Sequence, residues 1–267
     1  TGSKPKWRLI HEMVLNMKLK GRVALITGAG SGLGLATAKV FAEEGAVVAA
    51  VDQHISDLDN EIAGLGENSQ RRISSFELDV TDRDGLGAVY EKIVESFGQV
   101  DILVNNAGIA QIKDFVDISP VEWRRMMDVH VKGSFLCSQA VLPSMIDKRW
   151  GRIINTASVA GMTGGPRNAH YATAKASIVG FTRSLALEYA RYGITVNAVA
   201  PGLINTPMVT RGTGADKEKV VDYFTRRIPV RKLGEATDIA KAHLYLASED
   251  ASYITGQILS PNGGFLM

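Results

Sequence analysis

The feature that most restricts the fold of this chain is the alternation of short apolar, β-branched segments with longer segments of helical periodicity. Continuous apolar segments predict strands buried on both faces, as in parallel sheets with helices packed on either side. The sequence therefore predicts an α/β fold, with a doubly wound parallel sheet of about seven strands and helices on both faces. The expected strands are residues 22–28, 46–52, 71–80, 101–108, 151–158, 195–202 and 256–260. The expected helices include residues 32–45, 82–98 and 120–147.

The composition is that of a single globular domain. No Pro/Gly/Ser-rich linker divides the 267 residues, so residues 17–267 are expected to form one domain. Residues 1–16 differ in character and are interpreted as a native extension or a non-native remnant, with no function assigned. The net charge of +2 argues against nucleic-acid binding, and the longest apolar run, residues 46–51, is too short to span a membrane. One cysteine, Cys137, excludes an internal disulfide and favours a cytoplasmic location.

A glycine-rich segment, TGAGSGLG at 27–34, follows the first expected strand and begins the first helix. The spacing Gly28-x-x-x-Gly32-x-Gly34 allows a tight turn and a close approach of the backbone to a pyrophosphate. The helix N-terminus then offers free N–H groups and a partial positive charge. The segment alone is weak support for nucleotide binding.

Asp52 ends the second expected strand, 18 residues after Gly34. A carboxylate at about this spacing accepts hydrogen bonds from the ribose hydroxyls of adenosine, so the two features together predict a Rossmann-like dinucleotide site. The 2′-phosphate of NADP would face the Asp52 charge, and neither Ser31 nor Gln53 supplies a guanidinium to offset it. NAD is therefore the expected cofactor.

The motif YATAK places Tyr171 and Lys175 on one face of a helix. A phenol acts as a proton acceptor near neutral pH only if its pKa falls by about 2–3 units from about 10, which an adjacent ammonium favours. Ser158 lies at the end of a strand, 13 residues before Tyr171, and could donate a hydrogen bond to a carbonyl oxygen.

The motifs TGAGSGLG, NNAG, TAS, YATAK and APG occur in the order and at the spacings of the short-chain dehydrogenase/reductase family, which the chain resembles over about residues 18–264. The resemblance implies hydride transfer, with Tyr171 as general base or acid, Lys175 lowering the pKa of Tyr171 and Ser158 orienting the substrate oxygen. It also implies that Asn105 and Asn106 stabilise the sheet. The cofactor-binding residues that follow from the loop, Asp52 and the resemblance are Gly28, Ser31, Gly32, Leu33, Gly34, Asp52, Gln53, Asp79, Val80, Asn106, Ala107, Gly108, Tyr171, Lys175, Pro201, Gly202, Ile204 and Thr206.

His130 stands where the family usually has a catalytic asparagine, in DVHVKG instead of a DVN-x-x-G pattern. A histidine between two valines is more often a core residue with one hydrogen bond. The resemblance instead implies a fourth catalytic position at the floor of the active site, where a neutral imidazole holds a water molecule or the bend of the helix. A second departure is Asn262 in SPNGG, where the family usually has aspartate, and we expect it to bridge backbone groups in a turn.

The substrate pocket is expected to include residues 109–111, Val159, residues 164–170 and residues 203–227, with VTRGTGADKEK at 209–219 as a mobile lid. Arg167 and Arg211 could meet an anionic substrate, although solvated surface arginines are the commoner case. The substrate is expected to be a small-molecule secondary alcohol or ketone, with cyclic and aryl compounds among the candidates. The resemblance also implies a homotetramer, with interfaces formed by apolar stripes on 82–98, 120–147 and 169–192 and by the C-terminal strand.

Three functions remain open at this point. The first is an NAD-dependent secondary alcohol dehydrogenase. The second is a reductase of 3-oxoacyl thioesters, against which Asp52 argues. The third is a nucleotide-binding subunit or sensor without catalysis, which only His130 supports. The five histidines and one cysteine form no metal-ligand pattern, so no catalytic metal is expected.

Overall fold

The protein is described by a computed structural model that covers residues 17–207 and 217–267. Seven parallel strands form the central sheet in the order β3-β2-β1-β4-β5-β6-β9. Their bounds are β1 Val23–Thr27, β2 Val47–Asp52, β3 Ile73–Glu77, β4 Ile102–Asn105, β5 Gly151–Thr156, β6 Ile194–Val199 and β9 Ile258–Leu259. The predicted doubly wound sheet is confirmed.

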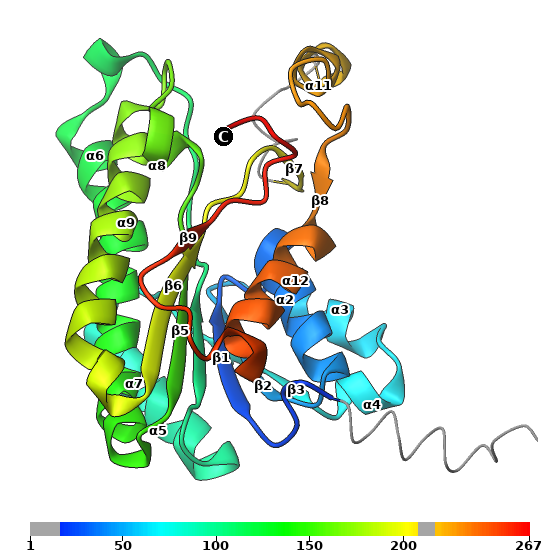
Figure 1. The fold of residues 1–267 in the computed structure, drawn as a ribbon, viewed down its shortest axis with the longest axis vertical. Coiled ribbons are helices and arrows are strands. Elements are labelled where there is room, and N and C mark those ends of the chain that lie inside the picture. Colours follow the sequence, from blue (N-terminus) through cyan, green and yellow to red (C-terminus); the bar gives the residue numbers. More distant parts are fainter. Residues whose placement is uncertain (1–16, 208–216) are drawn as a thin grey trace, which may run out of the picture.

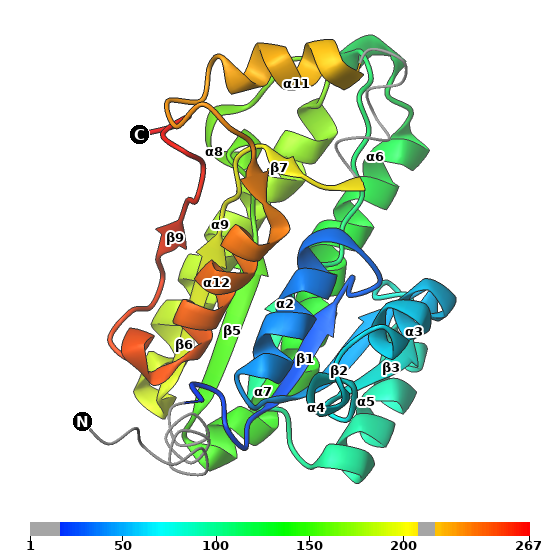
Figure 2. The ribbon, with the colours of Figure 1, turned by 90° about the vertical axis from the view of Figure 1, so that its right-hand side faces the viewer.

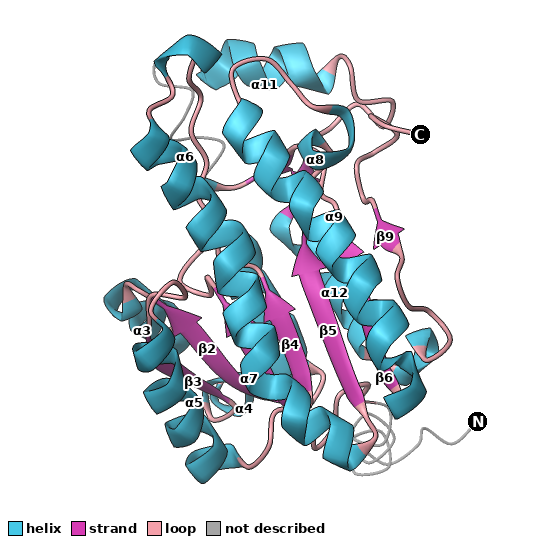
Figure 3. Ribbon diagram, turned by 90° about the vertical axis from the view of Figure 1, so that its left-hand side faces the viewer, coloured by secondary structure: helices cyan, strands magenta, loops and turns pink. Residues whose placement is uncertain are grey.

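Helices cover both faces of the sheet. Figure 2 shows α2 and α12 in front of the strands, and Figure 3, from the opposite side, shows α7 and α9. The main helices are α2 Gly32–Glu43, α3 Ile55–Ala63, α5 Arg83–Phe97, α6 Pro120–Met127, α7 Gly133–Lys148, α9 Ala169–Tyr189, α11 Lys217–Thr225 and α12 Ala236–Ala247. The short helices are α4 Glu67–Gln70 and α8 Ala160–Thr163, with 3₁₀ turns at Phe115–Asp117, Ala190–Tyr192 and Glu249–Ala251.

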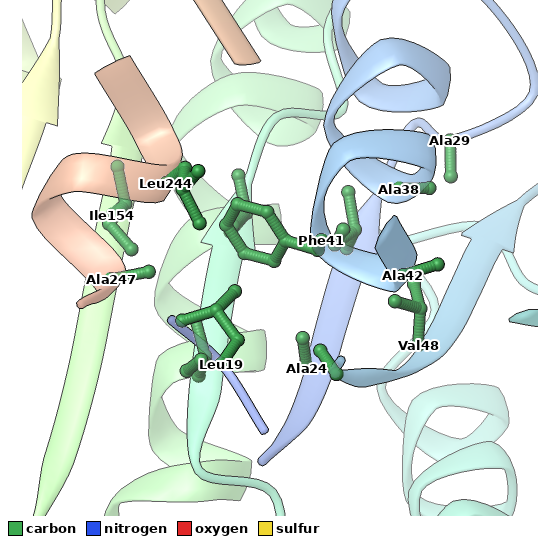
Figure 4. Packing of buried hydrophobic residues seen from close by; sticks show 14 of the residues in the cluster. Leu19, Ala24, Ala29, Ala38, Phe41, Ala42, Val48, Ile154, Leu244 and Ala247 are labelled. Atoms are coloured by element: carbon green, nitrogen blue, oxygen red, sulfur yellow. The ribbon is translucent and has the colours of Figure 1, made fainter. Parts of the chain in front are cut away.

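The core has one apolar layer on each side of the sheet. On the first side, Phe41 of α2 is fully buried and lies toward Leu244 of α12 and Ile154 of β5 (Figure 4). On the second side of the sheet, Leu136 and Met145 of α7 are buried in the cluster formed by the opposite faces of the strands. Because both faces of the strands are covered, β1, β4 and β5 are buried along their whole length, and in β5 this includes the polar residues Arg152, Asn155 and Thr156.

The predicted helix over 120–147 is not continuous. A π-helical turn at Asp128–Lys132 separates α6 from α7, which extends to Lys148. Within this turn, the carbonyl oxygen of His130 accepts a hydrogen bond from Ser134 Oγ (2.7 Å), while the imidazole bonds to a different segment of the chain. Such turns are frequent at functional sites.

The carboxyl ends of the strands carry the loops that form the site. From β1 the chain continues to β2 and then β3 on one side of β1 (Figure 1). The next strand, β4, lies on the opposite side of β1. Ligands of open parallel sheets bind at such a reversal of strand order.

The sequence did not predict the small parallel sheet of β7 Ile204–Asn205 and β8 Gly234–Glu235, because two-residue strands leave no periodic pattern. The expected extension at 1–16 lies outside the described residues, as does most of the expected lid.

Candidate active site

The loop that joins β1 to α2 is shaped by its glycines. Gly28 and Gly32 have φ angles of 66° and 55°, in the left-handed region that glycine adopts without strain. A Cβ at Gly34 would lie 2.1 Å from the carbonyl oxygen of Gly28. Ser31, the N-cap of α2, makes no capping hydrogen bond through its hydroxyl. The loop thus presents the first turn of α2 and a hydroxyl to the site, as phosphate-binding loops do.

The end of β4 is bonded to the same loop. The side-chain amide of Asn106 donates to the carbonyl oxygens of Thr27 (3.1 Å) and Gly28 (3.2 Å). The Thr27 hydroxyl accepts from the backbone N–H of Asn106 (3.0 Å). Inside the sheet, Asn105 Nδ2 donates to Oδ1 of Asn155 on β5 (2.8 Å). These bonds are the stabilising contacts that were predicted for Asn105 and Asn106, and they fix the glycine-rich loop against the end of β4.

Asp52 lies at the end of β2, beside the glycine-rich loop. Its Oδ2 accepts a hydrogen bond from the backbone N–H of Gly30 (2.9 Å), and its Oδ1 accepts one from the N–H of His54 (3.1 Å). Each carboxylate oxygen can accept a second hydrogen bond. The carboxylate is therefore held in place by the backbone and can still accept hydrogen bonds from hydroxyl groups of a ligand.

A cavity of about 310 Å³ lies along the carboxyl ends of the strands. It brings together the side chains or backbone of nearly all the predicted site residues, namely Gly28, Ser31, Gly32, Leu33, Asp52, Gln53, Asp79, Val80, Asn106, Ala107, Gly108, His130, Ser158, Tyr171, Lys175, Pro201, Gly202, Ile204 and Thr206. Gly34 is the exception: it packs against the loop backbone and does not line the cavity.

Tyr171 and Lys175 lie one turn apart on α9, and Ser158 follows β5. The Lys175 side chain is almost fully buried, and its Nζ donates to the carbonyl oxygen of Thr156 (2.6 Å). The same Nζ lies 5.8 Å from the centre of the Tyr171 ring. Ser158 Oγ accepts a hydrogen bond from the N–H of Ala160 (3.2 Å). The three polar groups that the sequence predicts for catalysis therefore converge in one buried region.

Burial controls the charges in this region. It lowers the pKa of Lys175 to about 7, because water no longer solvates the ammonium. Burial also raises the pKa of Tyr171, and a hydrogen bond with Ser158 offsets part of that increase. In the protein alone, desolvation of the phenol is the larger influence on the pKa of Tyr171. The expected effect of Lys175 on that pKa stays a prediction.

His130 is buried beside Tyr171, with the two rings nearly perpendicular and their centres 5.6 Å apart. Its Nε2 lies 2.8 Å from the carbonyl oxygen of Ile109 and 3.2 Å from the backbone nitrogen of Ile109. One ring nitrogen carries either a proton or a lone pair, so it satisfies only one of these two groups at a time. Its Nδ1 is buried without a hydrogen-bond partner among the described residues.

The His130 imidazole is neutral at physiological pH. Its pKa is lowered to about 3, first by burial and second by the charge of Lys175, while the bond to Ile109 acts in the opposite direction. Gly108 makes room for the ring, since a Cβ there would lie 2.5 Å from His130 Cε1. His130 is thus a buried histidine bonded to the backbone, as the interpretation as a core residue predicts. It also lines the cavity, as the interpretation as a residue at the floor of the site predicts.

A polar network connects the segment after β4 with α6 and the start of α9. His170 Nε2 lies 2.9 Å from Gln111 Oε1, and Gln111 Nε2 donates to Glu122 (2.7 Å). Glu122 also accepts from Lys113 Nζ (2.7 Å), and these bonds hold the pKa of its carboxyl well below the usual range. The sequence predicted Gln111 and His170 as substrate-pocket residues, and neither lines the cavity of about 310 Å³. Lys113 was not predicted, and Glu122 is visible in the sequence only as part of the capping motif SPVE. The network thus ties Gln111 and Lys113 to both helices.

The remaining predicted positions are Arg167, Arg211 and Asn262. Arg167 is exposed and forms an ion pair with Asp114 (3.0 Å), as expected for a surface arginine, whereas Arg211 lies outside the described residues. Asn262 forms the predicted turn, in which its Oδ1 accepts from the N–H of Gly264 (2.9 Å) and its Nδ2 donates to the carbonyl oxygen of Leu266 (2.9 Å). Thr156 was not predicted as a site residue. Its backbone carbonyl accepts the hydrogen bond of Lys175, and a backbone acceptor leaves no signature in the sequence.

Comparisons with known proteins agree with this geometry. A family model described as enoyl-(acyl carrier protein) reductase matches residues 28–266. A 3-oxoacyl-[acyl-carrier-protein] reductase of Thermotoga maritima is 41% identical over 251 residues, which cover 94% of this chain and all of that protein. The chain belongs to the short-chain dehydrogenase/reductase family. It is therefore an oxidoreductase that acts on CH–OH or keto groups.

Other members of the short-chain dehydrogenase/reductase family differ in substrate. The (2S)-[(R)-hydroxy(phenyl)methyl]succinyl-CoA dehydrogenase subunit BbsD of Thauera aromatica is 42% identical, and the match covers 93% of this chain and 98% of that protein. The crystal structure of levodione reductase superimposes with a TM-score of 0.89 at 36% identity, over 92% of this chain and 98% of that one. Similarity at this level establishes the family and the fold, whereas the substrate varies.

Two further observations concern ligands and membranes. Within residues 17–207 and 217–267, no group of three or more His, Cys, Asp or Glu side chains is placed to hold a metal ion. In the same residues, no helix is both long and apolar enough to cross a membrane.

Proposed function

We propose that this protein is an NAD-dependent oxidoreductase that transfers a hydride between a secondary alcohol or ketone and nicotinamide. The observation that carries the proposal is the position of Asp52 relative to Tyr171 and Lys175 in one cavity. Asp52 is the last residue of β2, whereas Tyr171 and Lys175 pack where β5 ends, three strand intervals away. That separation, about 14 Å, suits an elongated dinucleotide with a ribose at each end.

The residues present fit this cofactor. The glycine-rich loop would hold the pyrophosphate at the N-terminus of α2, and Asp52 would accept from the adenosine ribose. Asp79 and Val80 would contact adenine, and Pro201, Gly202, Ile204 and Thr206 would hold the nicotinamide end. Bound nicotinamide would accept or supply the hydride.

The protein's own residues would handle the proton. The Ser158 hydroxyl would donate a hydrogen bond to the substrate oxygen, and the Tyr171 hydroxyl would take the proton of an alcohol or return it to a ketone. Lys175, when protonated, would favour the phenolate form of Tyr171 and bind ribose hydroxyls. Because burial raises the pKa of Tyr171 in the protein alone, we infer that positive charge brought into the site is needed to ionise this phenol.

For His130 we propose a supporting role at the floor of the site. Its neutral ring holds the loop after β4 through Ile109, and its unpaired Nδ1 could bind a water molecule near Lys175. In this role the His130 ring would position the loop and the water molecule, in place of the asparagine that the family usually has here.

A second candidate function is the reduction of 3-oxoacyl thioesters. It is favoured by the Thermotoga maritima relative, which matches over its whole length and is named for this activity. The choice between the two functions rests on the cofactor and the substrate, because the fold and the catalytic groups are the same.

The test is to follow nicotinamide absorbance with NAD and, separately, NADP against a panel of cyclic and aryl secondary alcohols. A parallel assay uses an acetoacetyl thioester with NADH or NADPH. We expect turnover of a secondary alcohol with NAD. Reduction of the thioester with NADPH, and no turnover of any alcohol with NAD, would favour the second function instead.

We also propose a cytoplasmic homotetramer. Phe135 on α7, Leu187 on α9 and Leu259 on the edge strand β9 are exposed apolar residues on elements expected at the interfaces. Cys137 is free and buried, in keeping with a reducing compartment. Light scattering should give a mass near four chains, and a mass near 28.7 kDa would refute the assembly. Fractionation that recovers the protein outside the cytoplasm would refute the location.

A further inference from the structure

The glycine-rich loop contains a glycine, Gly30, that the backbone conformation does not require. Gly28 and Gly32 have positive φ angles, and Gly34 is packed against the carbonyl of Gly28. Gly30 is not among the residues with positive φ, so other amino acids can adopt its conformation without backbone strain. Its small size therefore needs another explanation.

The space beside Gly30 is filled by the carboxylate of Asp52. A Cβ at Gly30 would lie 2.9 Å from both Cγ and Oδ2 of Asp52, and 3.3 Å from Oδ1. No other heavy atom is among its three nearest neighbours. The N–H of Gly30 also donates to Oδ2 (2.9 Å), so the same residue leaves room for the carboxylate and holds it.

A side chain at position 30 would displace the carboxylate and leave the loop intact. The conflict involves the end of a short, rotatable side chain, which moves more easily than backbone. The backbone N–H would remain available as a donor, but the carboxylate would have to turn away from it. The hydrogen bond from His54 to Oδ1 (3.1 Å) would be strained by the same movement.

We propose that Gly30 is a specificity-determining residue for the dinucleotide: its missing side chain sets the position of the Asp52 carboxylate at the adenosine ribose. This rests on the proposed preference for NAD and adds a second residue to it. Substitution of Gly30 by a larger residue should weaken binding of NADH more than binding of NADPH, because only NADH gains from a carboxylate at the 2′-hydroxyl.

The experiment measures dissociation constants of NADH and NADPH by fluorescence titration. The proteins are wild type, Gly30→Ala, Gly30→Val, Asp52→Ala and the double variant Gly30→Ala/Asp52→Ala. We expect Gly30→Ala to reduce the preference for NADH over NADPH by about fivefold, the equivalent of one hydrogen bond, and Gly30→Val to reduce it further. In the Asp52→Ala background, Gly30→Ala should change the preference less than about twofold, because the group it displaces is gone. Gly87→Ala on α5 is the matched control, since a Cβ there meets no atom within 4 Å, and it should leave the preference unchanged.

The outcomes separate the two proposals. An NADH preference that survives both Gly30 substitutions would overturn the role of Gly30 alone, as would an equal loss of NADH and NADPH binding. Equal effects of Gly30→Ala with and without Asp52 would also overturn it, because the substitution would then act through the loop backbone. A wild-type protein that binds NADPH at least as tightly as NADH would refute the NAD assignment itself, and this proposal with it.

Discussion

Two buried histidines make the folded protein sensitive to acid. The pKa of His243 is lowered to about 3 by burial, and that of His130 is lowered to about 3 by burial and by Lys175. His243 Nδ1 lies 2.9 Å from the hydroxyl of Thr37 on α2. Because that hydroxyl donates to the carbonyl of Leu33 (2.7 Å), it accepts from Nδ1–H of His243. The buried Nε2 then carries the lone pair, and a proton added there would find no acceptor among the described residues.

The size and the sign of the effect follow from these pKa values. A histidine in the unfolded chain has a pKa of about 6.5. Between pH 6.5 and pH 3 the unfolded chain binds protons that the folded chain does not, so the free energy of unfolding falls as the pH falls. At about 1.4 kcal/mol per unit, each histidine lowers that free energy by about 2 kcal/mol at pH 5, and both together by about 4 kcal/mol. The stabilisation is complete above about pH 6.5. Lys175, with a folded pKa of about 7, is protonated in both states below that pH and does not add to this slope.

The assay is urea unfolding followed by circular dichroism between pH 7.5 and 5, at one protein concentration, for wild type and His243→Leu. Between pH 7 and pH 5 the variant should lose about 2 kcal/mol less than the wild type, whatever its absolute stability. His54→Gln, at an exposed histidine, is the control and should keep the wild-type slope. An identical slope for wild type and His243→Leu would refute the reasoning.

Two more predictions concern the active site. His130→Asn should retain activity within about tenfold of wild type, because an amide can donate to the carbonyl of Ile109 and accept from its N–H at the same time. The measurements are kcat/KM and far-UV circular dichroism. A folded but inactive variant would contradict the placement of His130. Alcohol oxidation should become faster with rising pH, because burial raises the pKa of Tyr171 and oxidation needs the phenolate, whereas the rate of ketone reduction should not rise. The measurement is the pH profile of kcat/KM in both directions. An oxidation rate that falls between pH 7 and 9 would contradict this prediction.

The sequence predicted the sheet because its signal is local and repeated. Each apolar strand is buried on both faces, so its pattern shows directly in the residues, and Asp52 and Ser158 could be located from the ends of such strands. The break at Asp128–Lys132 could not be predicted, because an apolar periodicity continues through it. His130 within this turn lies 2.8 Å from the carbonyl oxygen of Ile109, 21 residues away in the sequence, and such a contact leaves no periodic signal.

The same limit applies to contacts made through space. The position of Gly30 against Asp52 joins residues 22 apart, and the network of Gln111, Glu122 and His170 joins residues up to 59 apart. The pKa of Tyr171 is raised because the fold buries the phenol, and the spacing of Tyr171 and Lys175 contains no information about burial. Residue types and spacings thus locate the chemical groups, whereas their charges depend on the packing around them.

The central claim is that this cavity binds a nicotinamide dinucleotide and uses Tyr171 to move the proton. The most direct test of this claim compares wild type with Tyr171→Phe. NADH binding is measured by fluorescence titration, and turnover by nicotinamide absorbance with the best alcohol of the panel. We expect NADH affinity within about threefold of wild type, because the phenyl ring keeps the shape of the site, and a loss of turnover of about 10²–10⁴-fold, the range for a lost general base. Full turnover in the variant would contradict the role of Tyr171, and a wild-type protein that binds neither NADH nor NADPH would contradict the assignment of the cavity.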